Sequence, residues 1–118
     1  MHEARERTLL RIFIDENERA SHMPLYEAIV LRAREQKLAG ATVLRAAMGY
    51  GQSTILHTTK ILRLSTALPL VIEIVDTEEK IEKFLPELDG MIHSGLVTIE
   101  KVRVLHYGAS QTGNVNEP

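Results

Sequence analysis

Along this chain the spacing of apolar residues changes from strand-like to helical and back, and the order of these changes constrains the fold most. A two-residue alternation predicts a strand over residues 8–14, and a four-residue spacing predicts a helix over residues 24–39. The later patterns predict a strand over 41–48, a strand over 70–75, a helix that begins near residue 76, and a strand over 96–107.

Proline, glycine and a capping sequence mark the expected ends of the two helices. Pro24 suits the first turn of a helix because its missing N–H has no intrahelical partner there, and Gly40 suits the stop position. Asp76-Thr77-Glu78-Glu79 has the residues of a capping box, in which the aspartate accepts from the backbone N–H near the last glutamate. Pro86 is expected to kink the second helix or to cost it a hydrogen bond.

The order strand, helix, strand, strand, helix, strand predicts an α+β fold of the ferredoxin-like βαββαβ type. Such a fold has a four-stranded antiparallel sheet with two helices on one face, and here it has a long loop after strand 2. The 118 residues, 44% apolar and 25% charged, fit one ordinary domain with its own core. We expect a single domain over residues 1–118, with a folded core at 8–107, a mobile loop at 49–66 and a disordered tail at 108–118.

The second face of the expected sheet carries more apolar residues than a soluble monomer usually exposes. Its expected members are Leu9, Phe13, Val71, Val75, Leu105 and Tyr107. Glu73 and Lys101 can form an ion pair of modest strength between neighbouring strands. We infer that copies of the chain associate through this face of the sheet.

Composition argues against several classes of protein. The chain has no cysteine, which excludes disulfides, thiolate catalysis and cysteine-based zinc sites. Its five histidines never occur at ligand spacing with a second histidine, so no metal site is expected. No uncharged run is long and apolar enough to span a bilayer, and we expect a cytoplasmic protein that is not membrane-embedded. A net charge of −2 gives no reason to expect nucleic acid as a partner.

Residues 40–65 carry the strongest indication of a functional site. Gly49 and Gly51, on either side of Tyr50, permit backbone conformations in which a ligand or a second backbone comes close. The same glycines also suit a tight turn or a bulge. Lys60 and Arg63, farther along, are either ligand contacts or a solvated basic pair.

The remaining side chains of this loop also allow two interpretations. They form a docking surface for a partner protein, or they pack down at the foot of the loop. The residues concerned are Ile55, Leu56, His57, Ile61 and Leu62. We favour the docking surface.

Four segments carry a resemblance to a known family. They are Pro-Leu-Tyr-Glu-Ala-Ile at 24–29, Gly-Ala-Thr-Val-Leu-Arg at 40–45, Met-Gly-Tyr-Gly at 48–51, and Leu-Pro-Leu-Val-Ile-Glu-Ile-Val-Asp at 68–76. With them the chain resembles the PII-like signalling proteins, and most closely an uncharacterised PII-like domain-of-unknown-function family. The resemblance implies a homotrimer with its sheets facing inward, a mobile loop after the second strand, and clefts between subunits in which PII proteins bind adenine nucleotides.

The resemblance also implies a set of ligand-binding residues. Gly49-Tyr50-Gly51 is similar to the Gly-Phe-Gly at the start of the PII signalling loop, Gly95 matches a glycine after the second helix, and Lys101 falls near a lysine that contacts phosphate. Together with Lys60 and Arg63, these residues would bind an effector such as ADP, ATP or a related nucleotide. No cofactor is required, and the loop would signal to a membrane transport protein or an enzyme.

Two other functions occur on folds of this topology. A small ferredoxin-like enzyme, with a substrate pocket at the subunit interface, would need a phosphate-gripping loop after the first strand, where Asp15-Glu16-Asn17-Glu18 is acidic. No pair of nucleophile and base stands out, so no catalytic residue is assigned. An RNA-binding module would need aromatic residues on its central strands, and residues 70–75 have none. The sequence favours a regulatory protein that is not an enzyme.

Overall fold

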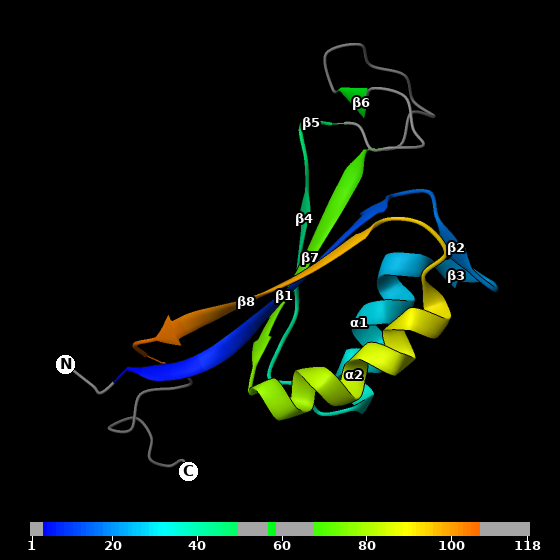
Figure 1. Cartoon of the computed structure of the whole chain (residues 1–118). Coiled ribbons are helices and arrows are strands. Elements are labelled where there is room, and N and C mark those ends of the chain that lie inside the picture. The colour runs from blue at the N-terminus through cyan, green and yellow to red at the C-terminus, as the bar shows by residue number, and fades with distance from the viewer. Residues whose placement is uncertain (1–3, 50–56, 59–67, 107–118) are drawn as a thin grey trace, which may run out of the picture.

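The computed structural model of the chain describes residues 4–49, 57–58 and 68–106 (Figure 1). The expected tail at 108–118 and most of the expected mobile loop at 49–66 lie outside the described residues.

Four strands form one antiparallel sheet in the order β4–β7–β1–β8. The central strands are β1 (Arg5–Asp15) and β7 (Pro69–Asp76), and the edge strands are β4 (Thr42–Arg45) and β8 (Leu96–Val104). Helices α1 (Leu25–Glu35) and α2 (Glu78–Met91) lie together on one face of the sheet (Figure 1). The predicted α+β, ferredoxin-like βαββαβ fold is thereby confirmed.

Two further strand pairs, each of two-residue strands, lie outside this sheet. β2 (Arg19–Ala20) pairs with β3 (Met23–Pro24) in the connection from β1 to α1, which the sequence indicated only as polar. β5 (Met48–Gly49) pairs with β6 (His57–Thr58) beyond the ends of β4 and β7 (Figure 1). The strand predicted over 41–48 is therefore divided into β4 and β5. Strands this short show no apolar period, so the pattern could not reveal them.

The core lies between the two helices and the sheet face that they cover. Neighbouring strands bring apolar residues into register, as where Ile12 of β1 lies opposite Ile72 of β7. Fully burying one such side chain stabilises the fold by about 1.5–3 kcal/mol. The core residues are Leu10, Ile12, Ile14, Leu25, Ile29, Ala33, Leu38, Leu70, Ile72, Ile74, Ile81, Phe84 and Leu88.

Helix α1 ends before Gly40, so the predicted stop position is wrong. Lys37 takes a left-handed backbone conformation, with φ of 64°, although it is not a glycine. Its N–H donates to the Arg34 carbonyl, and the Leu38 N–H donates to the Ala33 carbonyl, both at 3.0 Å. This is the Schellman pattern of helix termination. Burial of Leu38 in the core and the two hydrogen bonds offset the strain at Lys37.

Helix α2 is capped by Thr77, so the predicted capping by Asp76 is also wrong. The Thr77 hydroxyl accepts from the Lys80 N–H at 3.2 Å, and Pro86 lies inside the helix as expected. The buried Asp76 carboxylate instead accepts from the Thr77 N–H at 2.6 Å and from the Ala39 N–H at 2.8 Å. Asp76 therefore holds the segment that follows α1 against the start of α2.

The opposite face of the sheet, here called the open face, is covered by neither α1 nor α2 (Figure 1). The register places on it Arg5, Arg7, Leu9, Arg11, Phe13, Asp15, Thr42, Leu44, Pro69, Val71, Glu73, Val75, Leu96, Thr98, Glu100, Val102 and Val104. About half of these residues are apolar, and they include the predicted Leu9, Phe13, Val71 and Val75.

Two details predicted for the open face are wrong. Leu105 lies beyond the end of β8, and the register instead places Val102 and Val104 on the side of Leu9. Glu73 and Lys101 do not pair, because β1 lies between their strands. Lys101 lies opposite Thr8, a buried residue on the helix-covered side. Tyr107 lies outside the described residues.

Candidate functional site

The chain enters and leaves residues 50–67 at one end of the sheet. Strand β4 ends at Arg45, opposite Leu70 near the start of β7, and the Ala46 N–H donates to the Pro69 carbonyl at 2.9 Å. Just beyond, Gly49 of β5 lies opposite His57 of β6. The segment that contains most of the predicted site residues therefore begins and ends at adjacent points of the sheet (Figure 1).

The side chain of Glu16 joins three parts of the chain at this end. Its Oε2 pairs with Nη2 of Arg45 at the end of β4, and its Oε1 accepts from the Leu68 N–H at 3.3 Å. The Glu16 N–H also donates to the Leu68 carbonyl at 3.0 Å. Because Glu16 directly follows β1, these contacts connect β1 to the segments on both sides of residues 50–67. We call this set of contacts the Glu16 clamp.

The clamp changes the ionisation of both partners. The hydrogen bond from Arg45 lowers the pKa of the Glu16 carboxyl, the Leu68 N–H lowers it further, and burial opposes both. The same bond from Glu16 raises the pKa of Arg45. A carboxyl whose pKa is lower in the folded state adds stability above its unfolded-state pKa, and this stability is lost as pH falls through the folded value. The clamp is therefore intact at neutral pH and weakens in acid.

Gly95 is glycine for a structural reason. Its φ is 131°, in a region that other residues rarely adopt, and a Cβ there would lie 2.5 Å from the Phe13 carbonyl oxygen. This close approach lets β8 begin directly beside β1, with Leu96 opposite Phe13. A contact of Gly95 with a ligand remains a prediction.

Within one chain, Lys101 lies far from both Gly95 and Gly49. Six residues of extended strand separate it from Gly95, which corresponds to about 20 Å. Gly49 continues the edge strand β4, whereas Lys101 belongs to β8 at the other edge. A single chain therefore does not bring Gly49 and Lys101 together.

Most of the other predicted site residues lie outside the described residues. They are Tyr50, Gly51, Ile55, Leu56, Lys60, Ile61, Leu62 and Arg63. His57 is described only as part of β6.

Carboxylates gather at the same end of the sheet as the clamp. Burial and the charge of Asp15 raise the pKa of Glu18, while Ser94, whose hydroxyl donates to Glu18 Oε2 at 3.4 Å, and His93 lower it. An anionic ligand placed here would meet Asp15 and Glu18, and Arg45 is already paired with Glu16. Such a ligand needs positive charge from elsewhere. In the described part of the chain, no group of three or more acidic or histidine side chains could hold a metal ion.

Glu16 and Arg45 are the residues of this site that sequence analysis missed. Both lie in segments that drew attention, the acidic turn at 15–18 and the Gly-Ala-Thr-Val-Leu-Arg segment. However, they are 29 residues apart, and no local pattern indicates that they pair. The available signal was the opposite charge of Glu16 and Arg45, since both positions are predicted to lie at the same end of the sheet.

Comparison with known proteins confirms the predicted resemblance. The model of the DUF190 family, described as "Uncharacterized ACR", matches residues 7–104. A UPF0166 protein of Aquifex aeolicus (strain VF5) is 45% identical over 101 residues, which cover 86% of this chain and 95% of that protein. A UPF0166 protein of Methanocaldococcus jannaschii is 34% identical over 97 residues, which cover 81% and 89%.

Solved structures of PII-like proteins share the fold. A putative PII-like signaling protein from Thermus thermophilus superposes with a TM-score of 0.64 at 17% identity, covering 89% of this chain and 94% of that one. CPII, a nitrogen regulatory PII-like protein from Thiomonas intermedia K12 bound to ADP, AMP and bicarbonate, superposes with a TM-score of 0.62 at 17% identity, covering 90% and 94%. At these identities the comparison shows the fold.

The clamp predicts a pH-dependent effect of Glu16→Gln. The glutamine keeps an oxygen for the Leu68 N–H but loses the charge that pairs with Arg45, so the variant should be less stable than the native chain at pH 7. The difference should shrink as pH falls below about 4.5, where the Glu16 carboxyl of the unfolded chain becomes protonated, and it should vanish once pH is below the lowered pKa of the folded chain. Urea unfolding at several pH values measures it, and Glu27→Gln, on the exposed surface of α1, is the control. A difference that stays constant from pH 7 to pH 3 would contradict the clamp.

Gly95 and Gly90 form a matched pair of alanine substitutions. Gly95→Ala forces a Cβ against the Phe13 carbonyl and an unfavourable φ, so it should lower the free energy of unfolding by about 1–3 kcal/mol. At Gly90, inside α2, nothing lies within 4 Å of an added Cβ, and alanine should raise stability by about 0.5–1 kcal/mol. Urea unfolding that gives both variants the same sign would show that Gly95 carries no strain requirement.

Proposed function

This chain belongs to the DUF190 family and has the fold of the PII-like proteins, and from that premise we propose that it is a regulatory protein that binds a small anionic effector between copies of itself. The effector is an adenine nucleotide such as ADP or ATP, and the assembly is a homotrimer. Residues 49–66 carry the signal to a partner, which is a membrane transport protein or an enzyme. The protein itself catalyses no reaction.

The separation of Gly49 and Lys101 carries this proposal. They lie at opposite edges of the sheet and at opposite ends of its strands, because Lys101 lies opposite Thr8 whereas Gly49 follows Arg45 at the other end, so they approach each other only between different copies of the chain. Within the sheet, β4 is antiparallel to β7, β7 to β1, and β1 to β8. A second copy's β4 placed against β8 in the same plane is therefore antiparallel too, which continues the pattern of the sheet.

Both edges have surfaces suited to such pairing. Edge β4 exposes Val43 on the helix-covered side and Leu44 on the open face. Edge β8 exposes Leu96 on the open face, and Val97 and Ile99 on the other side. Exposed apolar edges of a sheet favour association unless they are covered. Two different edges that pair head to tail give a closed ring when the rotation between copies permits it, and three copies agree with the PII resemblance.

A groove supports the same arrangement. It has a volume of about 450 Å³ and lies between α2 and β8, directly beside the exposed Val97. Its lining is Glu82, Leu85, Pro86, Leu88, Asp89, Ile92 and Val97. On β4 the residues of the helix-covered side are Val43 and Arg45, an apolar and a basic side chain. Val43 matches the apolar lining of the groove, whereas Arg45 is already paired with Glu16.

Charge supports an anionic effector held between copies. In the described part of the chain the end of the sheet near Gly49 is acidic, and in the proposed assembly a neighbouring copy brings the exposed Lys101 to it. A charge-assisted hydrogen bond from lysine is a common contact to phosphate. The solved structure of CPII, which shares this fold, holds ADP, AMP and bicarbonate. Neither described helix is long and apolar enough to cross a bilayer, and the proposal places the protein in the cytoplasm.

Light scattering and calorimetry test the assembly and the site. The native chain should have three times the mass of one 13.3 kDa chain and should bind ADP. Lys101→Ala should weaken ADP binding by about 1–3 kcal/mol, the usual cost of a lost charge-assisted hydrogen bond. Lys83→Ala, on the exposed face of α2, should leave it unchanged.

Mixing two defective variants tests whether the site is shared. Gly49→Trp should block nucleotide binding with a bulky side chain, and Lys101→Ala should weaken nucleotide binding by removing a positive charge. If each cleft takes Gly49 from one copy and Lys101 from the next, random mixing restores about one cleft in four. A mixture that binds no better than its two components would place both residues in the same chain's site, or in none.

A further inference from the structure

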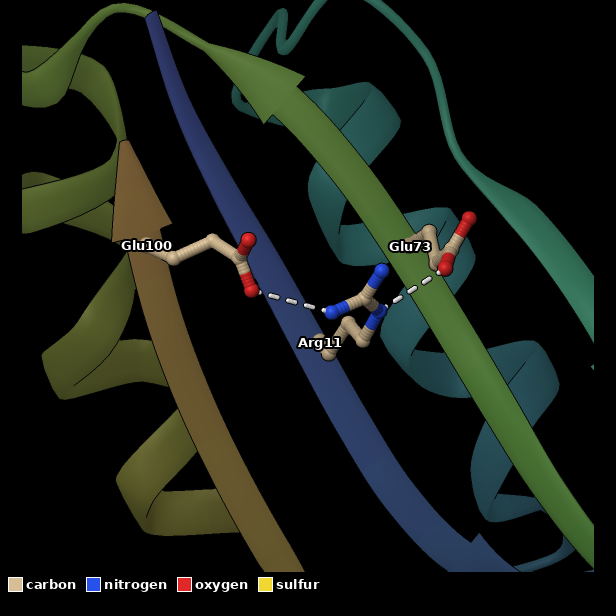
Figure 2. Close-up of polar contacts among 3 residues, drawn as sticks. All are labelled: Arg11, Glu73 and Glu100. Atoms are coloured by element: carbon tan, nitrogen blue, oxygen red, sulfur yellow. Dashed lines mark hydrogen bonds and ion pairs between the residues drawn. The ribbon is translucent and has the colours of Figure 1, made fainter. Parts of the chain in front are cut away.

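Arg11, Glu73 and Glu100 come from three neighbouring strands and form a charged cluster on the open face (Figure 2). Arg11 of β1 donates from Nε to Oε2 of Glu73 on β7 at 2.9 Å, and from Nη1 to Oε1 of Glu100 on β8 at 3.1 Å. Along β1 the cluster is flanked on the same face by Leu9 and Phe13. We call these three residues the Arg11 cluster.

The bonds within one chain do not use the full hydrogen-bonding capacity of the cluster. A guanidinium has five N–H donors, and each carboxylate can accept about four hydrogen bonds. The side chains of Arg11, Glu73 and Glu100 are 35%, 31% and 58% exposed, so water can reach the remaining donors and acceptors. A surface that covers the open face removes this water. It must then supply matching polar groups, because buried charges without partners are costly.

We propose that the Arg11 cluster selects the surface that covers the open face, and that this surface is the open face of another copy of the chain. The proposal rests on the trimer proposed above, taken as a ring of edge-paired sheets that closes with the open faces toward its centre, and it names the residues that recognise each other there. A wholly apolar partner would leave the remaining donors and acceptors of the cluster unpaired. A partner of one charge sign would repel either the arginine or the two glutamates.

A second copy supplies what the cluster needs. It brings one guanidinium and two carboxylates, so the arginine of one copy can meet a carboxylate of the next. The cluster alone carries a net charge of −1, and with Arg5, Arg7 and Asp15, which the register places on the same face, the charges of the open face sum to zero. The surrounding apolar residues, Leu9, Phe13, Val71, Val75 and Val102, are then covered by the same residues of the other copies.

Exchange of the charges tests this recognition. The triple variant Arg11→Glu/Glu73→Arg/Glu100→Arg keeps the ion pairs within one chain, with each charge reversed. In an interface with the native chain, however, arginine would face arginine and glutamate would face glutamate. Isotope-labelled native chain and the triple variant are mixed and the assemblies counted by native mass spectrometry. We expect each chain to assemble with itself, and mixed assemblies to fall at least tenfold below random assortment. Arg32→Glu/Glu87→Arg, which reverses the ion pair between α1 and α2, should mix at random.

A second variant keeps the proposal falsifiable if the exchanged chain does not fold. Arg11→Met/Glu73→Met/Glu100→Met replaces the cluster with apolar side chains of similar length. It should still assemble, but in more than one stoichiometry, because the polar contacts that select one arrangement are gone. Random mixing of the exchanged variant with native chain, or a single native stoichiometry of the methionine variant, would overturn the role of the cluster while the trimer stands. A native chain that is monomeric at all concentrations would instead remove the proposed function.

Discussion

The pairing of β1 with β7 on one side and β8 on the other is the interaction on which the rest of this structure depends. Its register sets Ile12 against Ile72 beneath the helices, and it sets Arg11 beside Glu73 on the open face. At the end of β1 the same pairing brings Glu16 to Leu68 and Phe13 to Leu96. One ladder therefore builds the core, the Arg11 cluster and the base of the candidate site.

The apolar pattern of the sequence predicted the four main strands and both helices. Strands β1 and β7 and both helices show a clear apolar period because they supply nearly all of the core residues, whereas the edge strands β4 and β8 supply none. Contacts without a period were missed. The Glu16 clamp joins residues 29 positions apart, the Arg11 cluster joins β1 to residues 62 and 89 positions away, and β5 and β6 are too short to show alternation. The helix ends were misplaced because Lys37 ends α1 through a left-handed backbone conformation, and because the Thr77 hydroxyl caps α2 in place of the neighbouring Asp76 carboxylate.

The predicted site residues divide in a way that has a physical meaning. Gly95 is required by the approach of the Phe13 carbonyl, so its presence is explained without a ligand. Gly49 and Lys101 lie apart within one chain, because Gly49 follows the edge strand β4 and Lys101 belongs to the other edge strand, β8. An assembly in which the edges of neighbouring copies meet would use both edges and cover their apolar side chains.

The most direct test of this arrangement is disulfide cross-linking, for which the absence of native cysteine is an advantage. Val43→Cys on β4 would be combined in turn with cysteine at positions 97, 99 and 101 of β8, all on the helix-covered side of the sheet. The two edges of one chain are too far apart to be linked, so a disulfide must join different copies. The account predicts that at least one pair gives covalent dimers and trimers under oxidation that disappear on reduction. Chains that stay monomeric with every pair would contradict it.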